Sequence, residues 1–130
     1  MMKKNIVTNF INAINSKDIE ALVSLMSEDH TFIDAYGSSV EGKEKMRNGW
    51  IGYFEWFPDY LIEAEQIIED GSTIVVFGFA SGTYKGMVDR PDAHWRIPVS
   101  LRAVVENKTI KKWQVYADTK IPFDIIVKYK

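Results

Sequence analysis

Apolar residues recur at helical spacing over the first quarter of the chain, and this pattern predicts two helices. The first is expected over residues 3 to 15, where one face carries Ile6, Phe10, Ile11 and Ile14. The polar stretch NSKD interrupts this pattern, and either Ser16 or Asp18 can cap the second helix. The apolar face of that second helix consists of Ile19, Leu22, Val23 and Met26.

The next stretch, HTFIDAYG (residues 30 to 37), has the alternation of a short strand. Side chains of a strand point to opposite faces in turn, so Phe32, Asp34 and Tyr36 are expected to share one face. After a turn-rich connection, a third helix that Pro58 stops is marked by Met46, Trp50, Phe54 and Phe57. Gly49 and Gly52 each weaken this helix by about 1 kcal/mol relative to Ala, so close packing or a ligand is expected to need the space.

The chain beyond Pro58 changes to a strand pattern and predicts four long strands in hairpin succession, over residues 59–71, 73–84, 94–106 and 110–119. The Asp-Gly pair within residues 69–72 is a hairpin turn signal. Pro98 cannot donate a ladder hydrogen bond, so it is expected at a bulge or an edge. The tail from Pro122 fits either a short helix or an added strand. Together these elements indicate an α+β fold with a curved antiparallel sheet and helices packed on one face.

Length and composition fit one domain over residues 1–130 with one hydrophobic core. Hydrophobic residues are 46% and charged residues 26%, and the net charge of −2 comes without a Lys/Arg stripe, so a nucleic-acid partner is not expected. There are no cysteines, no signal-peptide pattern and no apolar window of about 18 residues, so we expect no membrane span and a cytoplasmic location. The aromatic share of 13% fits either a ring-rich core or a cavity lined by rings.

Several stretches carry a resemblance to a known family. NSKDIEAL, MSEDHTFIDAYG, VEGKEKMR and the ending IKKWQVYAD resemble the nuclear-transport-factor-2-like superfamily, and within it the SnoaL-like and ketosteroid-isomerase-like branch. The resemblance runs from about residue 5 to residue 120. It implies a cone-shaped curved antiparallel sheet packed by three helices of the N-terminal half around an apolar pocket.

The resemblance also implies a role for Asp34. In the isomerases, a strand end similar to FIDAYG bears the aspartate that moves a proton next to a carbonyl. Their hydrogen-bond donors for the developing oxyanion do not match, because Phe10 stands where they have a tyrosine, and IPVSLRAVV contains no acid. A steroid-type isomerase is therefore not expected. The alternative for Asp34 is a structural carboxylate that is bonded to nearby backbone N–H groups or to Tyr36.

A second carboxylate lies in WQVYAD, where Gln114, Tyr116 and Asp118 share one face and resemble the ends of epoxide hydrolases and polyketide cyclases. Epoxide hydrolases also need an Arg-x-Asp pair on the central strand, and this chain has ASGTY there, so that activity is not expected. Cyclases of the SnoaL type, which use mainly one acid, agree better. Asp118 can equally be a strand-end or helix-capping residue.

The candidate catalytic residues are thus Asp34 and Asp118. The residues expected to line the pocket are Phe10, Phe32, Tyr36, Trp50, Phe54, Trp95 and Tyr116. His30 and His94 are expected at the surface, and without helical His-x-x-x-His spacing they predict no metal site. No cofactor is expected.

The leading functional hypothesis is a small-molecule site for a mostly apolar, carbonyl-bearing ligand, with isomerase, cyclase, dehydratase or other lyase chemistry. The competing hypothesis is a non-catalytic module for ligand sensing or dimerisation, and a third is a protein-interaction domain. We expect a homodimer through the outer face of the sheet, to which Trp113, Val115 and Ala117 are assigned.

Overall fold

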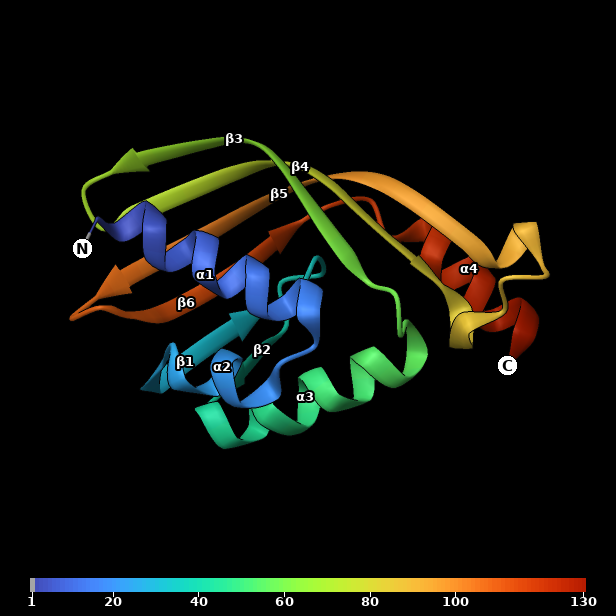
Figure 1. Ribbon diagram of the computed structural model, residues 1–130, viewed down its shortest axis with the longest axis horizontal. Coiled ribbons are helices and arrows are strands. Elements are labelled where there is room, and N and C mark those ends of the chain that lie inside the picture. The colour runs from blue at the N-terminus through green and yellow to red at the C-terminus, as the bar shows by residue number, and fades with distance from the viewer. Residues whose placement is uncertain (1) are drawn as a thin grey trace.

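The computed structural model describes residues 2–130. Its sheet bends around the first three of four helices, which lie on the concave side (Figure 1). The helices are α1 (Lys3–Ser16), α2 (Ile19–Ser24), α3 (Lys43–Trp56) and α4 (Lys120–Tyr129). The strands are β1 (Met26–Ile33), β2 (Ser39–Glu41), β3 (Leu61–Asp70), β4 (Thr73–Thr83), β5 (His94–Glu106) and β6 (Thr109–Tyr116). Two 3-10 turns, η1 (Tyr84–Gly86) and η2 (Pro91–Ala93), connect β4 to β5.

The six strands form one sheet in the order β2-β1-β6-β5-β4-β3. Neighbouring strands are antiparallel except β1 and β6, which are parallel. The predicted α+β cone with three helices from the N-terminal half is confirmed, but the sheet is mixed rather than purely antiparallel. The parallel pair joins the first strand of the chain to the last one, so the sheet holds the two halves of the chain together.

The break between α1 and α2 follows the predicted signals. Lys17 adopts a left-handed conformation with φ 57° and ends α1. Of the two predicted caps, Asp18 is the one used, and its side chain accepts a hydrogen bond from the backbone N–H of Ala21 at 3.1 Å. Asn15 fixes α1 to β3 because its amide bonds both the N–H and the C=O of Ile62 at 2.9 and 3.0 Å.

Other elements differ from the sequence prediction in position. α2 ends at Ser24, and Met26, predicted in this helix, begins β1. β1 ends at Ile33, so Asp34 and Tyr36 belong to a loop rather than to the strand. The tail forms a helix, α4. Pro98 lies opposite Phe79 on β4 but before the first residue of β5 that pairs with β6, which is the edge position that proline requires.

Alternation along β5 and β6 decides what the cone encloses. Every second residue of β5 is buried on the concave face, and the same face of β6 carries Trp113, which is 1% exposed. The assignment of Trp113, Val115 and Ala117 to the outer face is therefore wrong. Instead the exposed apolar side chains of β3, β4 and β6 are Leu61, Ile68, Phe77 and Tyr116. The homodimer itself stays a prediction.

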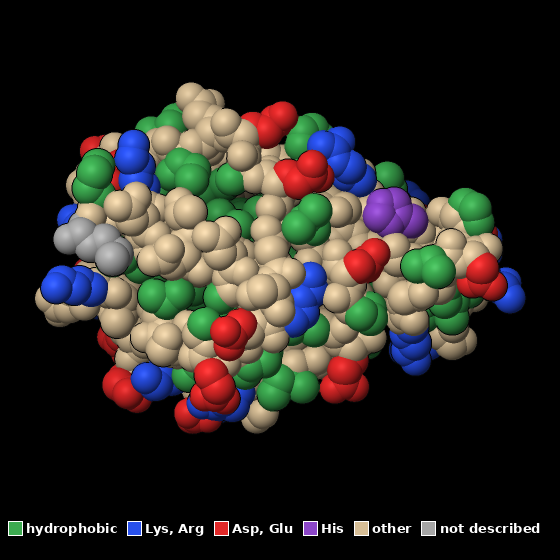
Figure 2. Space-filling view, viewed as in Figure 1, with side chains coloured by type: hydrophobic (Ala, Val, Ile, Leu, Met, Phe, Trp, Pro, Cys, Tyr) green, Lys and Arg blue, Asp and Glu red, His purple; other side chains and the backbone are tan. Residues whose placement is uncertain are grey.

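Charged side chains of both signs are interspersed over the surface seen in Figure 2. Within the described part of the chain, no helix is both long and apolar enough to cross a membrane.

His30 is buried, and the prediction of a surface position is wrong. Its side chain is 0% exposed because β1 lies between β2 and β6 and turns this residue toward Phe10 of α1, with ring centroids 6.3 Å apart. Nδ1 lies 2.7 Å from the carbonyl oxygen of Ile110, which requires the proton on this nitrogen, and Nε2 has no partner within residues 2–130. Burial lowers the pKa of His30 because the charged imidazolium loses its hydration.

This burial predicts a loss of stability in weak acid. The unfolded chain takes up the His30 proton at about pH 6.5, before the folded protein does, so stability is complete above that pH and falls below it, by up to about 1.4 kcal/mol per pH unit. Urea unfolding of the wild-type protein and of the His30→Gln variant between pH 7.5 and 5 gives the slope of the free energy of unfolding against pH. The difference between the two slopes is the contribution of His30. The His94→Gln variant, which keeps His30, should retain the wild-type slope, and an equal slope in His30→Gln would contradict the prediction.

Gly78 on β4 lies opposite an irregularity of β3 between Ala64 and Gln66. A Cβ atom at Gly78 would lie only 1.9 Å from the carbonyl oxygen of Glu63, so the two backbones approach each other as no other residue allows. Gly52 in α3 is the opposite case, because an added Cβ meets nothing within 4 Å. Of the two reasons expected for the space at Gly52, close packing is wrong, and the need of a ligand for it stays a prediction.

These two glycines predict opposite effects of the same substitution. Gly78→Ala should lower the free energy of unfolding by about 2–4 kcal/mol through overpacking. Gly52→Ala should raise it by about 0.5–1 kcal/mol because alanine favours the helix. Chemical denaturation of both variants gives the values, and an unchanged stability of Gly78→Ala would show that the strands separate there without cost.

Candidate functional site

A cavity of about 260 Å³ lies between the concave face of the sheet, α3 and α4. The sheet contributes alternate residues of β4, β5 and β6, among them Ala80, Trp95 and Trp113. α3 contributes Trp50, and α4 covers one end of the cavity with Pro122, Phe123 and Ile126. The lining is thus built from segments far apart in sequence, which only the curvature of the sheet brings together.

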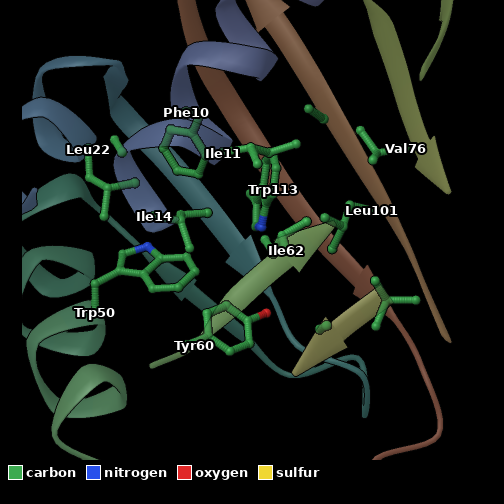
Figure 3. Packing of buried hydrophobic residues seen from close by; sticks show 14 of the residues in the cluster. Phe10, Ile11, Ile14, Leu22, Trp50, Tyr60, Ile62, Val76, Leu101 and Trp113 are labelled. Carbon is green, nitrogen blue, oxygen red and sulfur yellow. The ribbon is translucent and has the colours of Figure 1, made fainter. Parts of the chain in front are cut away.

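Aromatic rings dominate the wall of this cavity. All four tryptophans of the chain line it, namely Trp50, Trp56, Trp95 and Trp113. Tyr60 packs against three of these rings, because the centroid of its ring lies 4.9 Å from Tyr53, 6.1 Å from Trp95 and 6.4 Å from Trp50. Figure 3 shows Trp50 extending from α3 toward Tyr60. Of the two interpretations of the aromatic content, the structure therefore shows both a ring-rich core and a ring-lined cavity.

The structure brings only part of the predicted site together. Of the predicted site residues, those that line the cavity are Phe32, Asp34, Tyr36, Trp50 and Trp95. Phe10 does not line it, because it packs behind the wall, with its ring 4.7 Å from Trp113 and 6.5 Å from Trp50. Phe54 is also behind Trp50, at 5.4 Å, and faces Lys17 of the α1–α2 connection.

Tyr116 and Asp118 lie outside the cavity, and both predictions are wrong for the same reason. Trp113, Val115 and Ala117 face inward, so the alternate residues face outward. Tyr116 is 48% exposed. Asp118 is exposed and accepts a hydrogen bond from the backbone N–H of Lys120 at 3.0 Å, so it has the alternative role of a residue that begins a helix.

Asp34 holds a loop, as the structural interpretation expects, and it also lines the cavity, as the functional interpretation expects. It is half-buried at the start of the loop between β1 and β2. Its Oδ1 accepts hydrogen bonds from the N–H groups of Tyr36 and Ser38 at 2.9 and 3.0 Å, and Gly37 allows the turn with φ 85°. Its Oδ2 has no hydrogen-bond partner among residues 2–130. One oxygen therefore holds the loop, the other has no hydrogen-bond partner in the described chain, and Asp34 is one of the residues that line the cavity.

Two tyrosine hydroxyls also belong to this site, those of Tyr53 and Tyr60. Neither hydroxyl has a hydrogen-bond partner in the described chain, neither is among the fully enclosed polar atoms, and both residues line the cavity. Burial raises the pKa of both, and for Tyr53 the nearby Tyr60 adds to the effect. Both hydroxyls therefore stay protonated at neutral pH and can donate a hydrogen bond.

The remaining polar groups of the wall are of a different kind. The indole N–H groups of Trp50 and Trp95 are enclosed and have no hydrogen-bond partner in residues 2–130. The lining contains one ionisable acid, Asp34, and no Lys, Arg or His. Nowhere in the described residues do three or more His, Cys, Asp or Glu side chains come together as metal ligands.

The family model for the SnoaL-like domain matches residues 7–113. The chain belongs to the SnoaL-like domain family. No curated protein matches its sequence.

Solved structures agree with this SnoaL-like domain in fold. An LEH-like epoxide hydrolase from M. tuberculosis superposes with a TM-score of 0.79 at 14% identity, over 97% of this chain and 90% of that one. An NTF2-like protein of unknown function from Cytophaga hutchinsonii ATCC 33406 gives 0.74 at 20% identity, over 95% and 96%. A hypothetical protein with a ketosteroid isomerase-like fold from Catenulispora acidiphila DSM 44928, in complex with trimethylamine, gives 0.75 at 20% identity, over 85% and 83%. At these identities the similarity shows the fold.

Sequence reasoning missed several residues of the SnoaL-like cavity. The sequence pattern places Tyr60 in the strand predicted over residues 59–71 and not in the pocket, and it does not predict a lining from α4. A signal existed for β6, because Trp113, Val115 and Ala117 are the apolar half of the alternation and the apolar half normally faces the core. For Tyr53 and Tyr60 there is no such signal, because the sequence does not distinguish a tyrosine whose hydroxyl lies in a cavity from one whose hydroxyl lies in water.

Proposed function

We propose that this SnoaL-like domain binds a small, mostly apolar organic molecule in the cavity, with Asp34 as its main polar contact. The observation that carries the proposal is the combination of a ring-lined hollow with a carboxylate oxygen that has no partner in the described chain. Sites for small molecules are generally concave and apolar, with a few polar groups that fix the orientation of the ligand.

The size of the cavity limits the ligand. An engineered apolar cavity of about 150 Å³ is enough to bind benzene. The 260 Å³ here therefore suit a molecule of one or two rings, or a branched chain of similar volume. The trimethylamine in the Catenulispora acidiphila protein supports the view that a fold of this shape accepts small ligands.

A second candidate function is acid–base catalysis on a carbonyl compound. The hydroxyls of Tyr53 and Tyr60 favour it, because two protonated donors in a low-dielectric cavity can stabilise the oxygen of a developing enolate. In this mechanism Asp34 accepts the proton from the carbon next to the carbonyl through its free oxygen. These tyrosines come from α3 and from the segment before β3, so they would replace the first-helix tyrosine whose position is taken by Phe10. The competing function is a module of the same fold that binds and does not catalyse.

Filling the cavity should abolish binding without unfolding the protein. Ala117 lines the cavity near the end of β6, so Ala117→Phe places a ring inside it, whereas Gln114→Phe places the same ring on the outer face of the same strand. Because the four tryptophans line the cavity, their fluorescence should change on titration with cyclohexanone in the wild type and in Gln114→Phe. The response should be lost in Ala117→Phe, and an equal response of both variants would place the binding elsewhere.

The catalytic candidate has its own measurement. In D₂O, cyclohexanone bound at the site should exchange its α-hydrogens faster than in buffer, as followed by proton NMR. Asp34→Asn should slow the exchange by about 10²-fold or more, since an amide cannot accept the proton, yet it can still hold the loop. Asp118→Asn is the matched control and should exchange as the wild type does. Binding without accelerated exchange would establish the non-catalytic module instead.

A further inference from the structure

The lining of the cavity contains a negatively charged side chain and no positively charged one, and this difference indicates the charge of the ligand. Asp34 is the single charged side chain of the lining, and no Lys, Arg or His of residues 2–130 lies within 4.0 Å of its carboxylate. Glu63 on β3, by contrast, pairs with Arg96 at 3.0 Å. A half-buried carboxylate beside an apolar hollow lacks the cation that would normally accompany it.

Tryptophan rings from three elements line the same hollow. Trp50 and Trp56 come from α3, Trp95 from β5 and Trp113 from β6. The face of an aromatic ring carries partial negative charge, strongest for indole, and it attracts a cation within about 6 Å of the ring centroid. The enclosed N–H edges of Trp50 and Trp95 leave the other parts of these indoles to form the wall. The lining therefore offers four indole rings and one carboxylate but no positively charged side chain.

We propose that the ligand of this cavity is an organic cation, an ammonium group that carries methyl or other small alkyl substituents. The inference rests on the proposed function and names its ligand class. The alkyl groups contact the rings, the positive charge is stabilised by their faces, and the free oxygen of Asp34 supplies the counter-charge. Such a cation is weakly hydrated and costs less to transfer from water than a bare ammonium does. An anion is excluded from this site because it would meet both the carboxylate and the ring faces.

The test compares two molecules of equal shape that differ only in charge. Choline carries a trimethylammonium group, and 3,3-dimethylbutan-1-ol has the same shape with a neutral carbon in place of the nitrogen. Tryptophan fluorescence and calorimetry, at matched ionic strength, should give a dissociation constant at least about tenfold lower for choline. In Asp34→Asn, whose amide keeps the hydrogen bonds of the loop, the two constants should approach each other. Asp118→Asn should behave as the wild type.

The possible results separate the two proposals. If the alcohol binds as tightly as choline, the ligand is not a cation and the inference is overturned, while the binding function stands. If neither probe binds to the wild type, nor does cyclohexanone, the binding function fails as well. If Asp118→Asn loses as much affinity as Asp34→Asn, the preference for choline comes from the overall surface charge, and the assignment to Asp34 is overturned.

Discussion

The close approach of two backbones at Gly78 is the constraint on which the shape of this protein depends. The carbonyl group of Glu63 occupies the space that a side chain at Gly78 would need, at the place where β3 carries its irregularity. An irregular strand bends and twists more strongly than a regular one. The sheet therefore curls instead of extending flat (Figure 1), and the cavity lies on its concave side, between the sheet and α3.

The elements of this fold were predictable because their signals are local. Helical spacing predicts α1 and α3, the polar break predicts a cap at Ser16 or Asp18, and alternation predicts the long strands. What failed is the choice of face for β6, where a family motif was followed to bring Asp118 inward. The rule that the apolar half of an alternating strand faces the core predicts the correct face of β6, because turning Trp113 inward buries far more apolar surface than turning Tyr116 inward would.

The candidate site was predictable only where one residue determines its own surroundings. Asp34 with Gly37 three residues later is a turn signal, and it explains both the end of β1 and the use of one carboxylate oxygen in the loop. His30 gave no comparable signal, since its burial follows from the parallel pairing of β1 with β6. The pairing of strands that are distant in sequence decides which polar groups are enclosed, and this pairing cannot be inferred from a single sequence.

The hollow itself argues for a role in binding. If it stayed dry, a cavity of 260 Å³ would cost up to about 6 kcal/mol at the rate measured for voids in protein cores, which is comparable with the whole stability of a small domain. Ala80 and Ala117 line it, and larger residues at these positions would fill it and recover that free energy. A chain selected for stability alone would contain them. The small residues, the rings and the unpaired oxygen of Asp34 agree with one another if a ligand completes the core.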